Sequence, residues 1–342
     1  MRDQDQFWMK QALREAVKGW GTTNPNPLVG AVVVRDGKLI GKGYHIRPGE
    51  GHAEVNAIAN CGRKKTAGAT IYVTLEPCCT YGRTPPCTEA IIKAGITRVV
   101  FGCTDPNPQH AGRAVRILEQ NGIEVCYPVC EKECRRLNEP FFNWSTTGKP
   151  YVLLKMAETL DGKIATENGC SQWITGALAR KRVQQLRKRA DAVMGGAETF
   201  RLDHPRFTVR DAHGNTLKTP RRIIVTHHPE QFEQDGFDFV SLDHSEDWDR
   251  YLRSLGTEKI TTLLIEGGGE LAASALAAGA VDRVEFHIAP KILGGRDSRS
   301  SVAGTNPGSL SESWHLEDVE LRKAGTDLIY SARVKYNTEK DL

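Results

Sequence analysis

The 342-residue sequence lacks any apolar run that approaches the roughly 20 residues needed to span a bilayer. It also lacks an excess of charge of one sign, because 46 lysines and arginines are balanced by 42 aspartates and glutamates, for a formal net charge of +4. These absences argue against a membrane partner and against the densely basic surface of a nucleic-acid-binding protein. Phosphorylated small molecules remain compatible with such a surface.

The cysteines lack the even count and regular spacing of a disulfide framework. There are nine, and all but Cys170 lie before residue 135. Thiols and a metal ion in a reducing compartment explain this pattern better than disulfides do. The N-terminal segment 1–19 carries charges throughout and has no uninterrupted apolar core, so it does not look like a secretory signal. The sequence therefore predicts a cytoplasmic protein.

The length exceeds that of one typical core and favours two domains. Strand and helix patterns alternate in both halves, which predicts α/β architecture with a largely mixed sheet in the first. The predicted strands are 30–34, 39–45, 69–75, 98–101, 124–127, 151–156, 192–195, 222–226, 262–265 and 283–289. The predicted helices are 7–17, 52–60, 88–95, 112–121, 177–190 and one beginning at 270. The alternation lapses between Glu131 and Lys149, and the turn-forming segment 146–150 places the domain boundary between residues 147 and 148.

Two short segments of the first half contain the parts of a catalytic zinc site. His52 opens a predicted helix, Cys78 follows a predicted strand, and Cys87 opens the next helix after two prolines. One imidazole and two thiolates are suitable zinc ligands that leave a fourth position open. Glu54, two residues from His52, is the carboxylate that could take a proton from water and pass one to a leaving amine. The set therefore predicts a hydrolytic deaminase.

Each member of this set also has a simpler interpretation. His52 could merely cap a helix, and free cysteines are commonly buried core residues. The joint arrangement at a helix start, a strand end and a second helix start favours the metal site. Cys79 points to the other side if the chain there is extended. Cys126, Cys130 and Cys134 have no accompanying histidine, so we interpret them as core or surface thiols rather than a second metal site.

The spacing of the two cysteines separates the classes of protein that use such a site. Nucleobase deaminases pair their cysteines as C-x-x-C, whereas eight residues lie between Cys78 and Cys87. This loop, and the lack of a basic, aromatic-rich surface, disfavour a nucleoside or tRNA deaminase with an accessory domain. A non-catalytic, zinc-stabilised nucleotide-binding module would need four protein ligands, and only three are readily found. Catalysis on a small molecule is favoured.

The second half contains weaker signals. Gly267-Gly268-Gly269 follows an apolar strand and opens a helix, where backbone N–H groups and the helix dipole can bind phosphate. It is not a G-x-G-x-x-G fingerprint, and a tight strand-to-helix turn explains the glycines equally well. The basic residues of 180–182 and 187–189 read mostly as a solvated helix face, although one inward arginine could clamp a phosphate.

Both halves carry motifs of one known enzyme family. The sequence resembles the bifunctional deaminase/reductase of riboflavin biosynthesis over nearly its whole length and in family order. The deaminase-like motifs are Asn24–Gly30, His52–Glu54, Thr74–Cys87 and Asp105–Pro108, and the reductase-like motifs are Thr159–Lys163 and Ser171–Thr175. The chain departs from the family pattern at Thr80, where histidine is common, and at His204, where aspartate is usual.

The resemblance implies a fold and two reactions. The expected architecture is an N-terminal cytidine-deaminase-like three-layer α/β/α domain, residues 1–147, followed by a C-terminal dihydrofolate-reductase-like α/β domain, residues 148–342. The first would deaminate a diaminopyrimidinone ribosylamine 5'-phosphate with zinc, and the second would reduce the ribosyl group to ribityl with NADPH. The implied partner is thus a small phosphorylated pyrimidine, with neither nucleic acid nor membrane, and we expect a homo-oligomer.

The resemblance also implies site residues. The implied deaminase substrate contacts are Asn26, His45, Arg83, Asp105 and Asn107, and the implied reductase substrate contacts are Ser171, Arg187, Phe207, Arg210 and Glu266. The implied NADPH contacts are Ala157, Trp173, Thr199, Asp203, Gly268, Gly269, Glu270, Leu271, Ala272, Ala273 and Ser274. Lys155 and Glu266 are predicted to act near the reduced carbon, as an inward pair at the ends of two strands. The alternatives are that Trp173 is a core residue and that Lys155 is a structural ion-pair partner.

Overall fold

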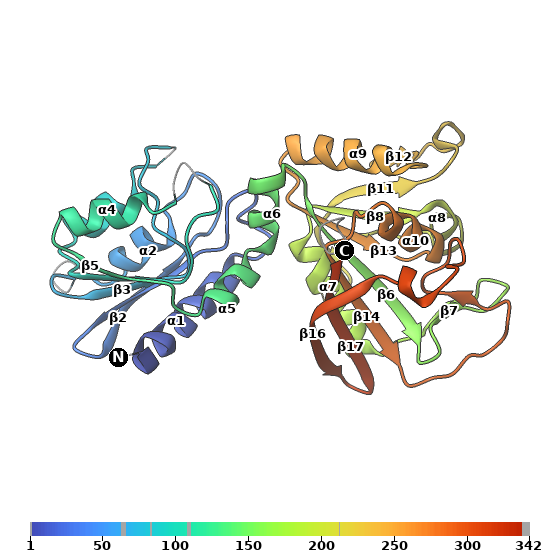
Figure 1. Cartoon of the computed structure of the whole chain (residues 1–342), viewed down its shortest axis with the longest axis horizontal. Coiled ribbons are helices and arrows are strands. Elements are labelled where there is room, and N and C mark those ends of the chain that lie inside the picture. Colours follow the sequence, from blue (N-terminus) through green and yellow to red (C-terminus); the bar gives the residue numbers. More distant parts are fainter. Residues whose placement is uncertain (1, 63–65, 83, 108–110, 212, 337–342) are drawn as a thin grey trace. The chain divides into compact units, whose positions relative to one another are not determined.

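A computed structural model describes residues 2–62, 66–82, 84–107, 111–211 and 213–336. The chain separates into two compact units, Met1–Gly148 and Lys149–Leu342 (Figure 1). Each unit has its own sheet and its own hydrophobic core. Within the described part of the chain, no helix combines the length and the apolar character needed to cross a membrane.

The first unit is built on a five-stranded mixed sheet in the order β2-β1-β3-β4-β5. The strands are β1 (Gly30–Arg35), β2 (Lys38–Tyr44), β3 (Thr70–Val73), β4 (Arg98–Phe101) and β5 (Glu124–Cys126). β1 is antiparallel to β2 and β3, whereas β3, β4 and β5 run parallel. The carboxyl ends of β3 and β4 therefore meet at one edge of the sheet, where the loop that carries Cys78 begins.

Helices cover both faces of this sheet and form three layers (Figure 1). The helices are α1 (Arg2–Ala16), α2 (Ala53–Ala59), α3 (Cys87–Lys93), α4 (Arg113–Gln120), α5 (Glu131–Leu137) and α6 (Glu139–Thr147). Apolar residues of α2, α3 and α4 pack on one face and those of α1 and α5 on the other. The predicted α/β/α arrangement is confirmed.

The segment before the boundary differs from the sequence-based expectation. It is not irregular, because α5 and α6 occupy almost all of it. Both helices are short and contact the core through few apolar side chains, such as Cys134 and Phe142, so they produce little hydrophobic periodicity. Asn138 between them exchanges two hydrogen bonds with the backbone of Leu28, at 2.8 and 2.9 Å. Tertiary contacts thus stabilise two helices that the hydrophobic pattern of this segment does not predict.

The second unit is built on an eight-stranded sheet in the order β12-β11-β8-β13-β6-β14-β17-β16. The strands are β6 (Tyr151–Thr159), β8 (Ala192–Gly196), β11 (Arg221–Val225), β12 (Asp238–Val240), β13 (Thr262–Glu266), β14 (Arg283–Ala289), β16 (His315–Ala324) and β17 (Asp327–Lys335). The first six strands in this order run parallel, and β17 and β16 are antiparallel additions. Two small ribbons join β7 (Lys163–Ala165) to β15 (Arg299–Ser300) and β9 (Val209–Arg210) to β10 (Thr216–Lys218).

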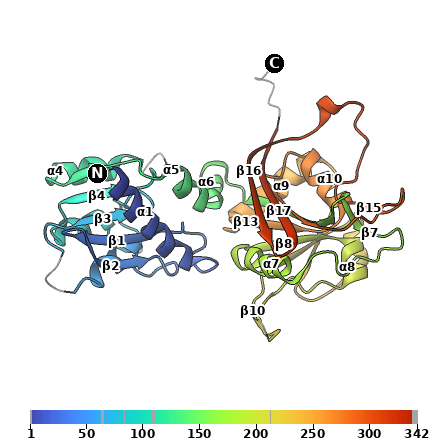
Figure 2. The same cartoon turned by 90° about the horizontal axis from the view of Figure 1, so that it is seen from below.

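Four helices cover the larger sheet. α7 (Ala177–Arg189) and α8 (Ala197–Asp203) lie on one side, and α9 (Ser245–Thr257) and α10 (Gly269–Ala277) lie on the other (Figure 2). The predicted α/β class is confirmed here too, although the sequence pattern did not predict α8, α9, β12 or the hairpin of β16 and β17. The exposed hairpin strand β16 carries mostly polar residues on both faces, which hides its period-two pattern.

Candidate active sites

In the first unit, three predicted metal ligands converge. His52 is the residue just before α2, Cys78 lies in the loop after β3, and Cys87 is the first residue of α3. Their potential ligand atoms all lie within 4.8 Å of one another. His52 Nδ1 is 3.3 Å from the Sγ atoms of both Cys78 and Cys87. Among the described residues, this is the group whose geometry suits a metal ion.

The local structure favours the thiolate form of Cys78, whereas the hydrogen bond with Cys78 raises the pKa of Cys87. The backbone N–H of Cys87, at the N-terminus of α3, donates to Cys78 Sγ at 3.2 Å. Hydrogen bonds from Cys87 and His52 lower the pKa of Cys78 despite its burial. A helix N-terminus also stabilises negative charge. One imidazole and two thiols so placed fit zinc with an open position.

Glu54 lies beside this group in the first turn of α2. Its side chain is 3% exposed, and Oε2 has no hydrogen-bond partner among the described residues. Burial, followed by the negative charge of Cys78, raises the pKa of Glu54 to about 7. An unpartnered buried carboxylate oxygen is costly unless something completes the site. Glu54 is therefore placed to accept and return a proton near neutral pH.

The predicted substrate contacts of this unit surround the same group in part. Asn26 Nδ2 and His45 Nε2 are 3.0 Å apart, and the His45 ring is 5.2 Å from the His52 ring. Asp105 and Asn107 follow β4, and the N–H of Asn107 donates to Asp105 Oδ1 at 2.8 Å. Arg83 lies outside the described residues.

One important residue of this site was missed by the sequence analysis. Glu76 is buried, and its carboxylate accepts hydrogen bonds from the backbone N–H groups of Asp105, Gly112 and Ala114, at 3.3, 3.1 and 3.3 Å. It thereby ties the loop that carries Asp105 to the loop that carries Cys78. A glutamate that directly follows a buried apolar strand was the available signal, because an unpaired buried charge is rarely tolerated.

The second unit contains a cleft of about 2360 Å³. Almost all the predicted reductase residues line it: Lys155, Ala157, Ser171, Trp173, Arg187, Thr199, Asp203, Phe207, Arg210, Glu266, Gly268, Gly269, Glu270, Leu271 and Ser274. Ala272 and Ala273 do not line it, because both are buried in α10 and Ala272 packs in the hydrophobic core. Basic side chains outnumber acidic ones around the cleft, which suits a phosphorylated ligand.

The glycine-rich turn opens α10 toward this cleft. Gly267 and Gly268 have φ angles of 79° and 81°, which favour glycine over other residues. A Cβ on Gly269 would lie 2.4 Å from the backbone oxygen of Ser300. The tight-turn interpretation is therefore correct, and it is compatible with ligand binding because Gly267, Gly268 and Gly269 all line the cleft. A helix N-terminus in a basic cleft fits the pyrophosphate of a dinucleotide.

Lys155 and Glu266 lie side by side in register on β6 and β13, and both line the cleft. The predicted position at two strand ends is wrong for Lys155, because Glu266 ends β13 but Lys155 lies in the middle of β6. Among the described residues, no ion pair within 4 Å joins the two side chains. Glu266 is instead held by Arg187 of α7, whose Nε and Nη2 donate to its two oxygens at 2.7 and 2.8 Å. The interpretation of Lys155 as a structural ion-pair partner is likewise not supported, since no such partner is present in the described part of the chain.

Solvent exposure of the side chains tests two further expectations, that Trp173 is a core residue and that the basic residues of α7 form a solvated face. Trp173 is 66% exposed, and the Arg180 guanidinium lies 4.7 Å from its ring centre, so Trp173 is not a core residue. The basic run of α7 is not simply a solvated face, because the Arg187 side chain is only 12% exposed and engages a buried carboxylate. Phe207 is almost fully buried with a φ of 50°, so any ligand contact there would involve its edge or backbone.

Comparisons with known proteins agree with this division of the chain. Residues 2–103 match the family described as cytidine and deoxycytidylate deaminase zinc-binding region, and residues 150–330 match the RibD C-terminal domain. The chain is 40% identical to the riboflavin biosynthesis protein RibD of Actinobacillus pleuropneumoniae, covering 95% of this chain and 93% of that protein. It is 37% identical to the Escherichia coli protein of the same name, covering 95% and 98%.

Solved structures give the same result. Acinetobacter baumannii RibD is 35% identical, with a TM-score of 0.86, and the match covers 98% of this chain and 100% of that one. A deaminase/reductase from Thermotoga maritima is also 35% identical with a TM-score of 0.86, covering 98% and 99%. The likeness thus spans both units together.

Proposed function

The chain belongs to the RibD family of riboflavin biosynthesis proteins, and from this premise we propose which of its residues carry the family's two reactions. It is a bifunctional enzyme, a deaminase and a reductase, that uses zinc and NADPH. We assign the deaminase reaction to residues 1–147 and the reductase reaction to residues 148–342. The substrate we propose is a diaminopyrimidinone ribosylamine 5'-phosphate.

The convergence of His52, Cys78 and Cys87 carries the deaminase assignment. These three residues would hold zinc, which when bound lowers the pKa of a water molecule toward neutrality. Glu54 Oε2 then takes a proton from the water and delivers one to the departing amino group. Its pKa of about 7 suits both directions of transfer, because neither protonation state is strongly disfavoured at neutral pH.

Loop residues would orient the pyrimidine in this site. Asn26 and His45 form a polar pair next to His52, and burial lowers the pKa of His45, which favours its neutral form. Glu76 keeps Asp105 and Asn107 at the opposite loop by binding backbone N–H groups. We propose that these side chains, with Arg83, contact the substrate.

The reductase assignment rests on the cleft of the second unit. NADPH supplies a hydride when bound, and reduction of the ribosyl group requires that the hydride reach the anomeric carbon. The bond from this carbon to the ring oxygen breaks, and the ring oxygen takes a proton. We propose that Lys155 Nζ holds this proton, because Lys155 lies in the cleft wall without an ion-pair partner among the described residues. The α10 N-terminus would bind the cofactor phosphates.

The remaining assignments concern the oligomeric state of the protein and its location in the cell. We propose a homo-oligomer located in the cytoplasm. The support for association is the edge strand β16, where Val319 and Leu321 are 48% and 60% exposed. An exposed strand with apolar side chains is a common place for a second subunit to pair.

A single variant tests both assignments when ammonia release and NADPH oxidation are followed together. Glu54→Gln should retain about one zinc per chain but lose ammonia release by roughly a hundredfold or more, because the proton shuttle is gone. NADPH oxidation should stop with the diamino compound and continue at the normal rate with the deaminated compound. Full ammonia release with zinc intact would refute the role of Glu54, and rapid NADPH oxidation with the diamino compound would refute the order of the reactions.

A further inference from the structure

A row of charged side chains crosses three neighbouring strands in the centre of the larger sheet. Glu266 on β13, Lys155 on β6 and Glu285 on β14 are partners in register. Side chains in register on adjacent strands leave the same face of a sheet. Arg187 and Arg182 of α7 each clamp one of the two carboxylates, so this face lies under α7. Lys155 therefore has a carboxylate on the strand at either side.

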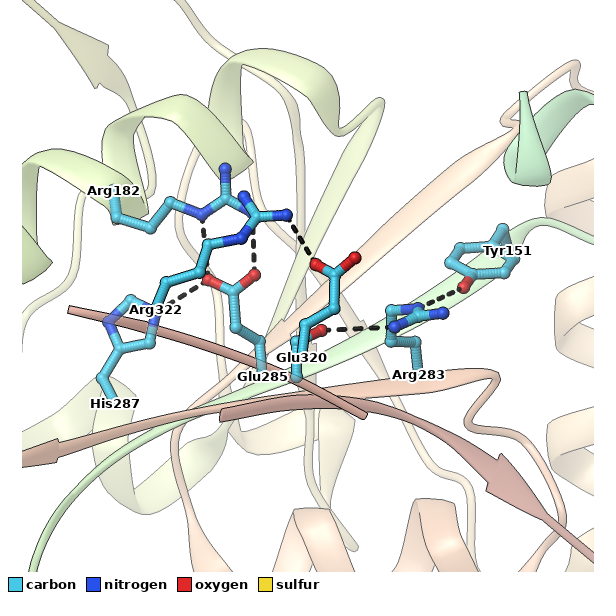
Figure 3. Close-up of polar contacts among 8 residues, drawn as sticks. Tyr151, Arg182, Arg283, Glu285, His287, Glu320 and Arg322 are labelled. Carbon is cyan, nitrogen blue, oxygen red and sulfur yellow. Dashed lines mark hydrogen bonds and ion pairs between the residues drawn. The ribbon is translucent and has the colours of Figure 1, made fainter. Parts of the chain in front are cut away.

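Two neighbouring side chains bind the buried carboxylate of Glu285. Arg182 Nε and Nη2 donate to its two oxygens at 3.0 and 2.8 Å, and His287 Nε2 lies 2.8 Å from Oε1 (Figure 3). Burial by itself would raise the pKa of Glu285, but the contacts with His287 and Arg182 lower it to about 2. Glu285 is thus a buried group that stays ionised at neutral pH.

His287 contributes a hydrogen bond but no charge. It is completely buried, and burial lowers its pKa. In the neutral ring, Nε2 must carry the hydrogen to donate to Glu285, which leaves Nδ1 as a bare acceptor. Nδ1 has no partner among the described residues. The ring therefore donates to Oε1 of Glu285, the oxygen that also accepts from Arg182 Nε.

Glu285 does not itself reach the cleft. Lys155 and Glu266 belong to the cleft wall, whereas Glu285 and His287 are not among the described residues that line it. Any effect of Glu285 on the reaction must consequently pass through a cleft residue, and its neighbour in register is Lys155.

We propose that Glu285, held by Arg182 and His287, is a positioning residue for the reductase reaction, which acts on Lys155 in the cleft wall through its negative charge on the neighbouring strand. This inference rests on the proposed role of Lys155 as proton holder. The charged and titratable groups that act on Lys155 are Glu266 on β13, Arg187 on α7, and Glu285 and His287 on β14.

The charges around Lys155 determine how its pKa would change if Glu285 lost its charge. Burial lowers the pKa of Lys155, and Arg187 lowers it further. Glu266 and Glu285 raise it. Because Glu266 is already paired to Arg187, loss of the Glu285 charge would leave Lys155 among an excess of cations. The deprotonated amine would then be favoured, and the proton for the ring oxygen would be missing.

The test measures Lys155 directly, in the full chain without cofactor. Competitive labelling of lysines with acetic anhydride, read by mass spectrometry, reports the fraction of each amine that is unprotonated. In Glu285→Gln, the labelling rate of Lys155 at neutral pH should rise about three- to tenfold, as a loss of one nearby charge implies. The falling high-pH limb of the reduction rate should move to lower pH, with the KM for NADPH unchanged.

Labelling across a range of pH separates this effect from a loosened structure. The midpoint reports the pKa of Lys155, whereas the high-pH plateau reports access of the reagent to the amine, so loosening would raise the plateau without lowering the midpoint. The control is Glu320→Gln, which removes a carboxylate from the same face, two strands from Glu285 and three strands from Lys155. Glu320 is paired with Arg322 at 2.6 Å (Figure 3), and Lys155 labelling should be unchanged in this variant. Unchanged or slower labelling of Lys155 in a folded Glu285→Gln protein would overturn the proposal.

If Glu285→Gln does not fold, Arg182→Gln carries the same test with the opposite sign. It removes a positive charge and keeps Glu285, so Lys155 labelling should become slower, and unchanged or faster labelling would overturn the proposal. Lys155→Met separates this inference from the function on which it rests. If Lys155→Met reduces the deaminated compound normally, the proton-holding role is wrong, whereas the labelling shifts would still report the coupling of Lys155 to Glu285.

Discussion

At the scale of the residue, buried glutamates of this chain differ in chemistry because their neighbours differ. Glu54 has an oxygen without a partner among the described residues, and its pKa is raised to about 7. Glu76 is saturated by backbone N–H groups. Glu266 is buried, which would raise its pKa, but Arg187 lowers it overall. Proton transfer is thus assigned to Glu54, because its Oε2 has no hydrogen-bond donor among the described residues that would offset the cost of burying the carboxylate.

Asp5 provides a residue-scale prediction about stability and pH. Its buried carboxylate receives two hydrogen bonds from Arg98, at 2.8 and 3.0 Å, and one from Tyr72 at 2.9 Å. Burial raises the pKa of Asp5, but Arg98 and Tyr72 lower it overall. A lowered pKa in the folded state means that the stabilisation is complete above the ordinary value of 3.8 and is lost as pH falls through the folded-state value.

We expect Asp5→Asn to lower the free energy of unfolding of the first unit by about 2–4 kcal/mol at neutral pH, because Arg98 loses its buried partner. The difference from the native protein should shrink below pH 3.8. Urea unfolding at several pH values measures it. Asp3→Asn is the matched control, because Asp3 is an exposed acid in the same helical turn. An equal loss of stability in both variants would contradict this account.

At the scale of the element, the close approach of α1 to β1 depends on one small residue. Gly30 begins β1, and a Cβ at this position would lie 2.1 Å from the Ala12 backbone oxygen and 2.4 Å from the Ala16 nitrogen. Both contacts are to backbone, so a rotamer change cannot relieve them. Ala12 and Ala16 are themselves fully buried, so this contact lies in the close-packed interior of the unit.

Gly30→Ala should therefore push α1 away from the sheet and destabilise the first unit by about 1–3 kcal/mol or more. Thermal unfolding followed by calorimetry would detect this as a lower transition temperature for the deaminase unit. The control is Gly82→Ala, because a Cβ on Gly82 would meet no atom within 4 Å. A transition temperature for Gly30→Ala equal to that of the control would show that α1 is not held in this way.

At the scale of the whole molecule, the chain divides into two units that each have a complete sheet and core. The metal-ligand group lies entirely in the first unit, and the cleft lies entirely in the second. Chemistry that depends on the metal should therefore be separable from chemistry that depends on the cleft.

Removal of zinc from the intact protein with EDTA tests this separation. Ammonia release should be abolished and the unfolding temperature of the first unit lowered, since metal binding stabilises the folded form of its site. NADPH-dependent reduction of the deaminated compound should persist. Restoration of ammonia release by zinc but not by magnesium is the control, and a parallel loss of both reactions would show that the two units do not function independently.

The sequence by itself determined the features that depend on interactions between residues close together in the chain. The first two strands, the strands and helices of the metal-site region, and the glycine turn before α10 are encoded by adjacent residues with clear periodicity or turn chemistry. The set of His52, Cys78 and Cys87 could be predicted because ligand types and their placement at element ends are visible in the chain. The short helices α5 and α6 could not, because few of their residues are buried.

Only the tertiary structure decided which charges meet. No local pattern pairs Arg187 with Glu266, or Arg182 with Glu285, because these partners are 79 and 103 positions apart. The sequence predicts Lys155 beside Glu266, and strand register also places it beside Glu285. Both carboxylates are bound by arginines of α7. Electrostatic interactions act through space and depend on burial, so the chemical roles of these residues appear only after the strands are in register and the helix is packed on them.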